Sequence, residues 1–139
     1  MISLYRPPDT DISLFDSKFS KFLQEISGKN NKKILIAADW NIDFLKSATD
    51  PKVDQFLNNM LSFGLLPTIT VPTRIAERSA TLLDNILINC PQEEYYARVI
   101  YDDISDHLPI LININCSTPQ SSVFANHLYK KYIYSERNF

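Results

Sequence analysis

Four short stretches of this 139-residue chain place polar side chains at the ends of apolar runs or inside them. Their members combine a phenol, carboxylates, amides and an imidazole: Tyr5, Asp39, Asn41, Asp84, Asn85, Asp106 and His107. In open α/β sheets ligands bind where strands end, so side chains at such places are candidates for a functional site. Carboxylates suit hard cations, an imidazole suits proton transfer near neutral pH, and a phenol donates a hydrogen bond.

The stretch Asp39-Trp40-Asn41-Ile42-Asp43 directly follows the apolar run at residues 34–38. Its alternating oxygen-bearing side chains resemble the start of a calcium loop. That interpretation fails, because Phe44 stands where the loop requires glycine and Asp50 stands where it requires glutamate. Two alternatives remain: a turn capped by its own Asp and Asn side chains, or a functional strand end.

Asp84 lies inside the apolar run at residues 82–88. A carboxylate buried in a strand is costly unless it is paired, and His107 is a natural partner because a carboxylate stabilises an imidazolium. The alternative is an edge strand with Asp84 in solvent. Asp106 could hold a hard cation such as Mg²⁺, and His107 could act as a base, or as an acid toward a phosphate oxygen. Taken alone, the Asp-His pair also fits an exposed surface, and Tyr5 also fits a buried aromatic.

The hydrophobic pattern predicts the elements that must position these side chains. Apolar residues recur at helical spacing over residues 11–27 and 51–63, with Gly28 and Gly64 as terminators. Extended segments are expected at residues 2–5, 34–38, 68–73, 82–89, 96–101 and 109–115. The order strand, helix, strand, helix and then several strands predicts an α/β fold.

Composition places the chain among ordinary globular domains and excludes several classes of protein. It is 45% hydrophobic and 22% charged with a net charge of -2, so the total shows no strongly basic nucleic-acid-binding surface. Two glycines exclude a Walker A loop and a dinucleotide fingerprint. Cys90 and Cys116 form no CxxC pair, and neither a membrane-length apolar run nor a signal-peptide pattern occurs. We therefore expect an intracellular, cytoplasmic or nuclear protein without membrane contact.

Taken in order, the motifs resemble the endonuclease/exonuclease/phosphatase superfamily. They are Tyr5-Arg6-Pro7-Pro8, Asp39-Trp40-Asn41-Ile42-Asp43, Pro72-Thr73-Arg74 with residues 79–86, and residues 105–110. Within the superfamily the chain is most similar to the endonuclease domains of non-LTR retrotransposons, which nick target DNA. The resemblance implies the C-terminal half of a four-layer α/β sandwich, a mixed sheet with two helices on its outer face. This partial domain would span residues 1–116, and residues 117–139 would form a linker or tail.

The resemblance also implies in-line attack of water on a phosphodiester and a role for each candidate residue. Tyr5 would contact the scissile phosphate, and Asn41 would stabilise it in the transition state. Asp39 would position or activate the attacking water, and Asp84 would orient the catalytic His107. The implied metal ligands, for Mg²⁺ or Mn²⁺, are Asp106 and Asp39.

Two departures from the family pattern bear on activity. Ala38 and Trp40 stand where the family has Gly and Phe, which removes no functional group. No glutamate matches the metal-binding glutamate that the first half of the family domain supplies. We therefore expect a truncated domain with weakly bound metal and impaired activity, whose partners are DNA, the missing N-terminal half and a downstream reverse-transcriptase domain. The alternatives are a superfamily phosphatase acting on a lipid or nucleotide, and a non-catalytic remnant that serves as an interaction module.

Overall fold

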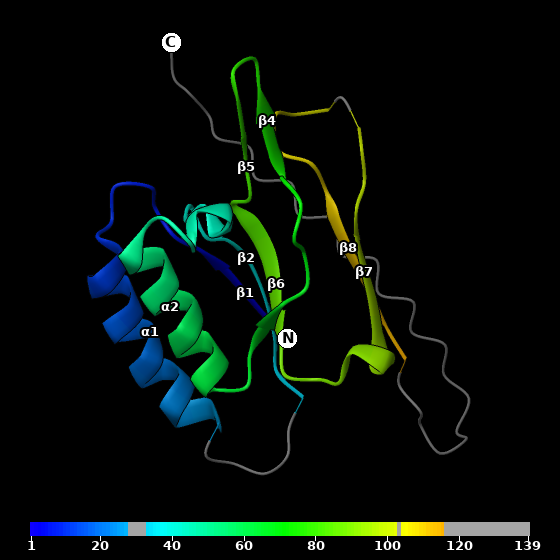
Figure 1. Ribbon diagram of the computed structural model, residues 1–139. Helices are drawn as coiled ribbons and strands as arrows, with labels where there is room; N and C mark the ends of the chain where they lie inside the picture. The colour runs from blue at the N-terminus through cyan, green and yellow to red at the C-terminus, as the bar shows by residue number, and fades with distance from the viewer. Residues whose placement is uncertain (28–32, 103, 116–139) are drawn as a thin grey trace.

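The computed structural model describes residues 1–27, 33–102 and 104–115 (Figure 1). Two helices, short 3-10 turns and eight strands follow one another along the chain. In order they are β1 (Ile2–Tyr5), α1 (Ile12–Ser27), β2 (Leu35–Asp39), η1 (Phe44–Lys46), α2 (Pro51–Ser62), β3 (Leu66–Pro67), β4 (Arg74–Ala76), β5 (Ser79–Thr81), β6 (Asp84–Ile88), η2 (Gln92–Glu94), β7 (Tyr95–Val99) and β8 (Ile110–Ile114).

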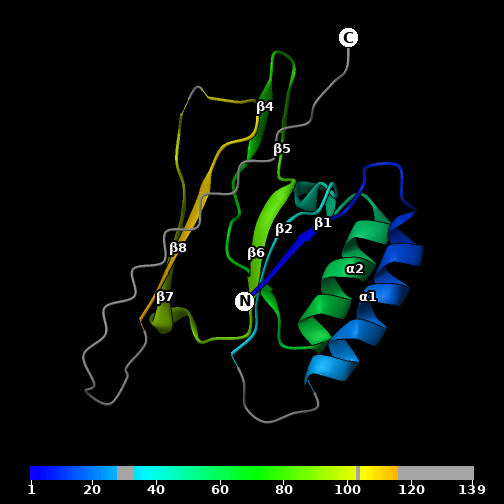
Figure 2. The same cartoon turned by 180° about the vertical axis from the view of Figure 1, so that it is seen from behind.

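The main sheet has four strands in the order β1-β2-β6-β3. β1 runs parallel to β2, whereas β6 is antiparallel to both β2 and β3. Helices α1 and α2 cover one face of this sheet, and the antiparallel pair β7–β8 lies against the other face (Figures 1 and 2). The expected α/β class, a mixed sheet with two helices on one side, is therefore confirmed.

The hydrophobic core between the helices and the sheet is centred on Trp40, which is fully buried. Four phenylalanine rings surround it at centroid distances of 5.6–6.4 Å: Phe15, Phe19, Phe44 and Phe56. Trp40 Nε1 donates to the carbonyl oxygen of Asn85 on β6, so its polar atom is also paired. The residue directly after β2 is thus anchored in the core, which fixes where the polar side chains on either side of it can lie.

Helix α2 begins and ends as its sequence predicts. The Asp50 side chain accepts a hydrogen bond from the backbone nitrogen of Lys52, and Pro51 is the first helical residue. Gly64 adopts a φ of +72° just beyond the helix, a conformation that glycine reaches without strain. The predicted terminator of α1, Gly28, lies outside the described residues, as do Cys116 and the expected tail at residues 117–139.

Residues 68–73 form no strand, although their sequence predicts an extended segment. Here the buried side chain of Asn85 supplies hydrogen-bond partners that a neighbouring strand would otherwise provide. Its Oδ1 accepts from the backbone nitrogens of Thr68 and Ile69, and its Nδ2 donates to the Ile69 carbonyl. The chain then forms the β4–β5 hairpin. None of the helices in the described ranges is long and apolar enough to cross a membrane.

Candidate functional site

Three of the candidate side chains stand in one row at the end of the main sheet. Tyr5 of β1 is the register partner of Asp39 on β2, and Asp39 is in turn the partner of Asp84 on β6. Directly paired residues of neighbouring strands point to the same face of a sheet. Alternation along β2 and β6 puts this row on the face toward β7–β8, away from the helices.

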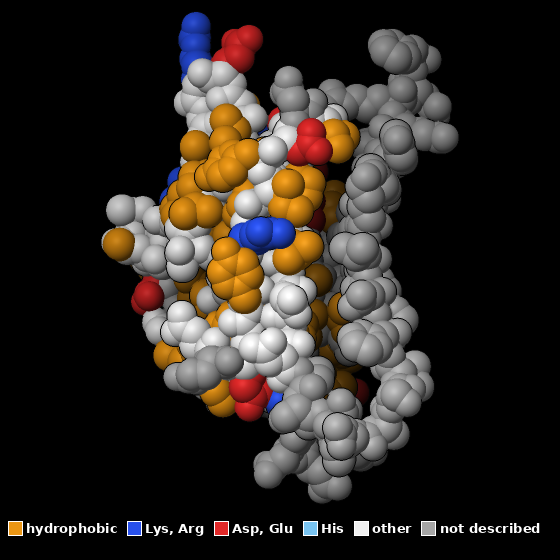
Figure 3. Space-filling view, turned by 90° about the vertical axis from the view of Figure 1, so that its right-hand side faces the viewer, with side chains coloured by type: hydrophobic (Ala, Val, Ile, Leu, Met, Phe, Trp, Pro, Cys, Tyr) orange, Lys and Arg blue, Asp and Glu red, His pale blue; other side chains and the backbone are white. Residues whose placement is uncertain are grey.

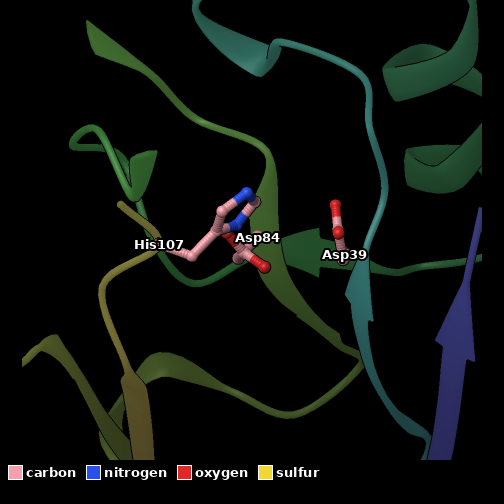
Figure 4. A group of neighbouring side chains, drawn as sticks. All are labelled: Asp39, Asp84 and His107. Atoms are coloured by element: carbon pink, nitrogen blue, oxygen red, sulfur yellow. The ribbon is translucent and has the colours of Figure 1, made fainter. Parts of the chain in front are cut away.

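His107 reaches the row from the loop that precedes β8. The backbone at residues 73–75, at the start of β4, holds this loop: Leu108 N donates to Thr73 O at 2.6 Å, and Ile75 N donates to Asp106 O at 2.9 Å. The imidazole Nδ1 lies 2.8 Å from Asp84 Oδ2, as the sequence led us to expect (Figure 4). Since β6 is an inner strand with β2 and β3 on its sides, the alternative of an edge strand with Asp84 in solvent does not describe this fold.

Asp39, Asp84 and His107 form a group that could hold a divalent cation (Figure 4). Each offers one ligand atom, and these atoms all lie within 4.8 Å of one another in half-buried surroundings. Two carboxylate oxygens and an imidazole nitrogen suit a metal such as Mn²⁺, and the carboxylates suit Mg²⁺. The donor set therefore fits the cation that the sequence implies.

The electrostatics of the group favour a protonated His107. The hydrogen bond to Asp84 raises the pKa of the imidazole, burial opposes this, and the charges of Asp84, Asp39 and Asp106 raise the pKa further. The net pKa lies above the ordinary value for histidine. The protonated form, in which both ring nitrogens donate, therefore persists to a higher pH than in an isolated histidine.

Asp106, the other metal ligand expected from the sequence, pairs with Arg74 in this structure. The Arg74 Nε and the Asp106 Oδ2 are 2.9 Å apart, and the Asp106 side chain is 51% exposed. Burial alone would raise the pKa of the Asp106 carboxyl, but the hydrogen bond and charge of Arg74 bring the pKa below its ordinary value. Asp106 is not a member of the three-residue group.

Asn41 occupies a left-handed turn directly beside the row. Its φ is +48°, a conformation that asparagine tolerates better than most residues. Its backbone nitrogen donates to Asp39 Oδ1 at 3.2 Å, and its side-chain Nδ2 donates to the carbonyl of Arg6 at 2.7 Å. The amide is therefore held within the turn that follows β2, on the same end of the sheet as Asp39.

Asp43 and Thr73 hold the backbone around the site. Asp43 Oδ1 accepts from Leu82 N at 3.0 Å as well as from its own turn. The buried Thr73 hydroxyl accepts from the backbone nitrogens of Leu83 and Asp84, at 3.1 and 2.9 Å. The sequence pattern does not predict this role of Thr73, because its partners lie ten and eleven residues away.

Comparisons with known proteins identify the family and the fold of the chain. Residues 1–111 match a family model described as endonuclease-reverse transcriptase. The solved endonuclease domain of TRAS1, a telomere-specific non-LTR retrotransposon, superposes with a TM-score of 0.61 at 20% identity, over 82% of this chain and 56% of that one. An endonuclease/exonuclease/phosphatase family protein from Leptotrichia buccalis C-1013-b gives a TM-score of 0.47 at 22% identity, over 68% of this chain and 40% of that one. No curated protein matches the sequence. The resemblance inferred from the motifs is confirmed, and the chain spans about half the length of the solved proteins it matches.

Proposed function

This chain belongs to the endonuclease-reverse transcriptase family, and from that premise we propose that it is a metal-dependent phosphodiesterase that nicks DNA. The observation that supports the proposal best is the convergence of Asp39, Asp84 and His107, whose ligand atoms lie within 4.8 Å of one another. An acid–base group beside paired carboxylates at a strand end is suited to hydrolysis of a phosphodiester.

The proposed role of each side chain follows from the hydrogen bonds that it can donate or accept. Asp39 accepts a hydrogen bond from the attacking water and orients it. In its protonated form, which Asp84 stabilises, His107 donates to a phosphate oxygen. The Tyr5 hydroxyl, on a half-exposed side chain, and the second N–H of the Asn41 amide are further donors for the phosphate. A bound Mg²⁺ or Mn²⁺ would neutralise charge that develops on the phosphate oxygens.

We propose Asp39 as the first ligand of this cation, with the Asp84 carboxylate within reach of the same ion. The family resemblance implies Asp106 as a further ligand. To bind the metal, Asp106 would have to break its ion pair with Arg74. A site built in this way should bind the ion weakly, because one of its carboxylates is already engaged.

Nicking of supercoiled plasmid in the presence of Mg²⁺ or Mn²⁺ tests the proposal. Asp39→Ala and His107→Ala should each abolish nicking, whereas the control Asp54→Ala, at an exposed position of α2, should retain it. Nicking that survives both site substitutions would come from a contaminating nuclease and would contradict the proposal. A folded wild-type chain without any activity would favour the interaction module instead.

One observation does favour that second candidate. The outer face of β7–β8 is apolar and exposed, and Figure 3 shows hydrophobic side chains gathered there around a basic one. The exposed hydrophobic residues of β7 and the loop that follows it are Tyr96, Ile100, Tyr101 and Ile104. Patches of this kind are typical of protein contacts. The proposed occupant is the part of the domain that the TRAS1 endonuclease has and this chain does not span.

A substitution on this face tests the docking surface. If the face is a protein contact, the isolated chain should associate with itself through it at high concentration. Tyr96→Ser with Tyr101→Ser should then lower the apparent mass in light scattering, while the melting temperature stays within a few degrees of the wild type. A mass that does not change with these substitutions would remove the argument for a contact here.

A further inference from the structure

Arg6 is the most deeply buried cation in the described part of the chain, with 2% of its surface exposed. It follows β1 directly and lies beside the candidate site, since its backbone nitrogen donates to the carbonyl of Asp39 at 3.0 Å. No carboxylate of the described residues lies within ion-pair distance of its guanidinium. Burial lowers the pKa of the guanidinium and the charge of Asp11 offsets this only in part, so what holds this side chain in place needs an explanation.

Backbone carbonyls hold the guanidinium. Its Nη1 donates to the carbonyl oxygens of Trp40 at 3.2 Å and Asn41 at 3.0 Å, and its Nη2 donates to that of Thr10. The planar group also lies over the Phe15 ring at 5.7 Å, while its Nε has no acceptor among the described residues. Three carbonyls from two loops thus converge on one side chain.

The contact with Asn41 runs in both directions. The Arg6 side chain binds the backbone carbonyl of Asn41, and the Asn41 side chain binds the backbone carbonyl of Arg6 at 2.7 Å. Asn41 is also the described non-glycine residue with a positive φ, a conformation that the surroundings must stabilise. The reciprocal pair therefore fixes both the backbone and the amide of the turn after β2.

We propose that Arg6 is a positioning residue for the reaction, which locks the turn at residues 39–41 so that the Asp39 carboxylate and the Asn41 amide face the phosphate. The inference rests on the proposed nuclease function. Arg6 is not placed to contact the substrate itself, because both of its Nη atoms are engaged with carbonyls and almost none of its surface is exposed. It acts through the turn.

A lysine cannot replace this side chain. The guanidinium presents donors in a fixed planar fork, whereas an ammonium is a point charge on a flexible stem. Arg6→Lys keeps the charge and most of the apolar stem but loses the simultaneous bonds to the carbonyls of Thr10, Trp40 and Asn41. The substitution therefore separates the role of the fork from the role of the charge.

The test compares the 139-residue chain with Arg6→Lys and Arg6→Met, and uses Lys18→Met as the control, since Lys18 is an exposed cation on α1. Plasmid-nicking kinetics would be measured well below the melting temperature and normalised to folded protein. NMR would record the backbone and side-chain amide signals and the ¹³C shifts of Asn41, which report its left-handed conformation without any need for activity.

For both Arg6 variants we expect kcat to fall on the order of 10- to 100-fold with KM within about twofold, as for a small misplacement of reacting groups. The Asn41 signals should shift while those of β7 and β8 stay in place, and Lys18→Met should match the wild type. If Arg6→Lys keeps the wild-type kcat or leaves the Asn41 signals unchanged, the inference is wrong. If the wild type does not nick DNA at all, the proposed function fails, and the NMR comparison alone decides whether Arg6 fixes the turn. If Arg6→Met does not fold, the comparison of Arg6→Lys with the wild type still tests the inference.

Discussion

Asp39 and Asp84 are direct partners across the β2–β6 ladder, so two carboxylates stand side by side on one face of the sheet. Like charges at such positions repel each other, and the fold must compensate for this. His107 supplies part of the compensation, since its Nδ1 lies 2.8 Å from Asp84 Oδ2 and its pKa is raised. A divalent cation at the same place would supply the rest.

Metal binding is expected to stabilise the wild-type chain through Asp39. An ion that binds only the folded state adds about 1.4 kcal/mol to the free energy of unfolding at ten times its Kd. Asp39→Asn should lose most of this gain, because it removes a ligand charge from the group. Thermal unfolding with and without Mn²⁺ or Mg²⁺ measures the effect. Asp54→Asn on α2 is the control, and an undiminished gain in Asp39→Asn would exclude Asp39 as a ligand.

The Arg74–Asp106 ion pair is expected to compete with metal binding. Arg74→Gln should lower the Kd for Mn²⁺ several-fold, because it frees the Asp106 carboxylate and removes a positive charge near the site. Asp106→Asn should raise the Kd. Isothermal titration of the two variants with Mn²⁺ gives both constants. Equal Kd values in Asp106→Asn and the wild type would show that Asp106 plays no part in metal binding.

The Asp84–His107 pair should make stability depend on pH. Asp84 raises the folded-state pKa of His107, so the resulting stability is fully present below the unfolded pKa of about 6.5 and is lost as pH rises through the folded-state pKa. In urea unfolding without metal, Asp84→Asn should therefore cost more at about pH 5.5 than at about pH 9. His107→Gln should remove this dependence. A cost of Asp84→Asn that grows with pH would contradict the assignment.

Two threonines near the site offer a matched pair of identical substitutions. Thr73→Val leaves the buried backbone nitrogens of Leu83 and Asp84 without their acceptor, which should cost about 2–4 kcal/mol. Thr81→Val removes a buried hydroxyl with no hydrogen-bond partner among the described residues, so it should cost less than about 0.5 kcal/mol or even stabilise. Chemical unfolding compares the two. Equal costs would show that the Thr73 bonds contribute nothing.

The sequence predicts the elements of this fold better than it predicts their local contacts. Both helices and the strands at β1, β2, β6, β7 and β8 lie within a residue or two of the expected ranges, because their apolar patterns are strong. The segment at residues 68–73 and the β4–β5 hairpin were not predicted correctly. The start of the segment at residues 68–73 is bound by the side-chain amide of Asn85, which lies 17 positions from Thr68 and 16 from Ile69.

In the candidate site, too, the sequence predicts some features and misses the contacts between distant residues. The cost of burying Asp84 predicts a partner such as His107, and the two side chains do meet, although their catalytic roles remain predictions. The Arg74–Asp106 pair and the contacts of Arg6 with the Trp40 and Asn41 carbonyls could not be predicted, because each joins residues more than 30 positions apart. Residue types suggest which groups can react, but only the folded chain shows which of them are already engaged.

The register of β2 against β6 also ties correct folding to the chemistry of the site. If β6 slipped by one residue, its side chains would exchange faces. Asp84 would then point into the aromatic core around Trp40 without His107, and Asn85 would leave the backbone of Thr68 and Ile69 unpaired. Both consequences of the slip are costly. The polar residues of the site therefore disfavour the shifted register and help to select the native pairing of β2 with β6.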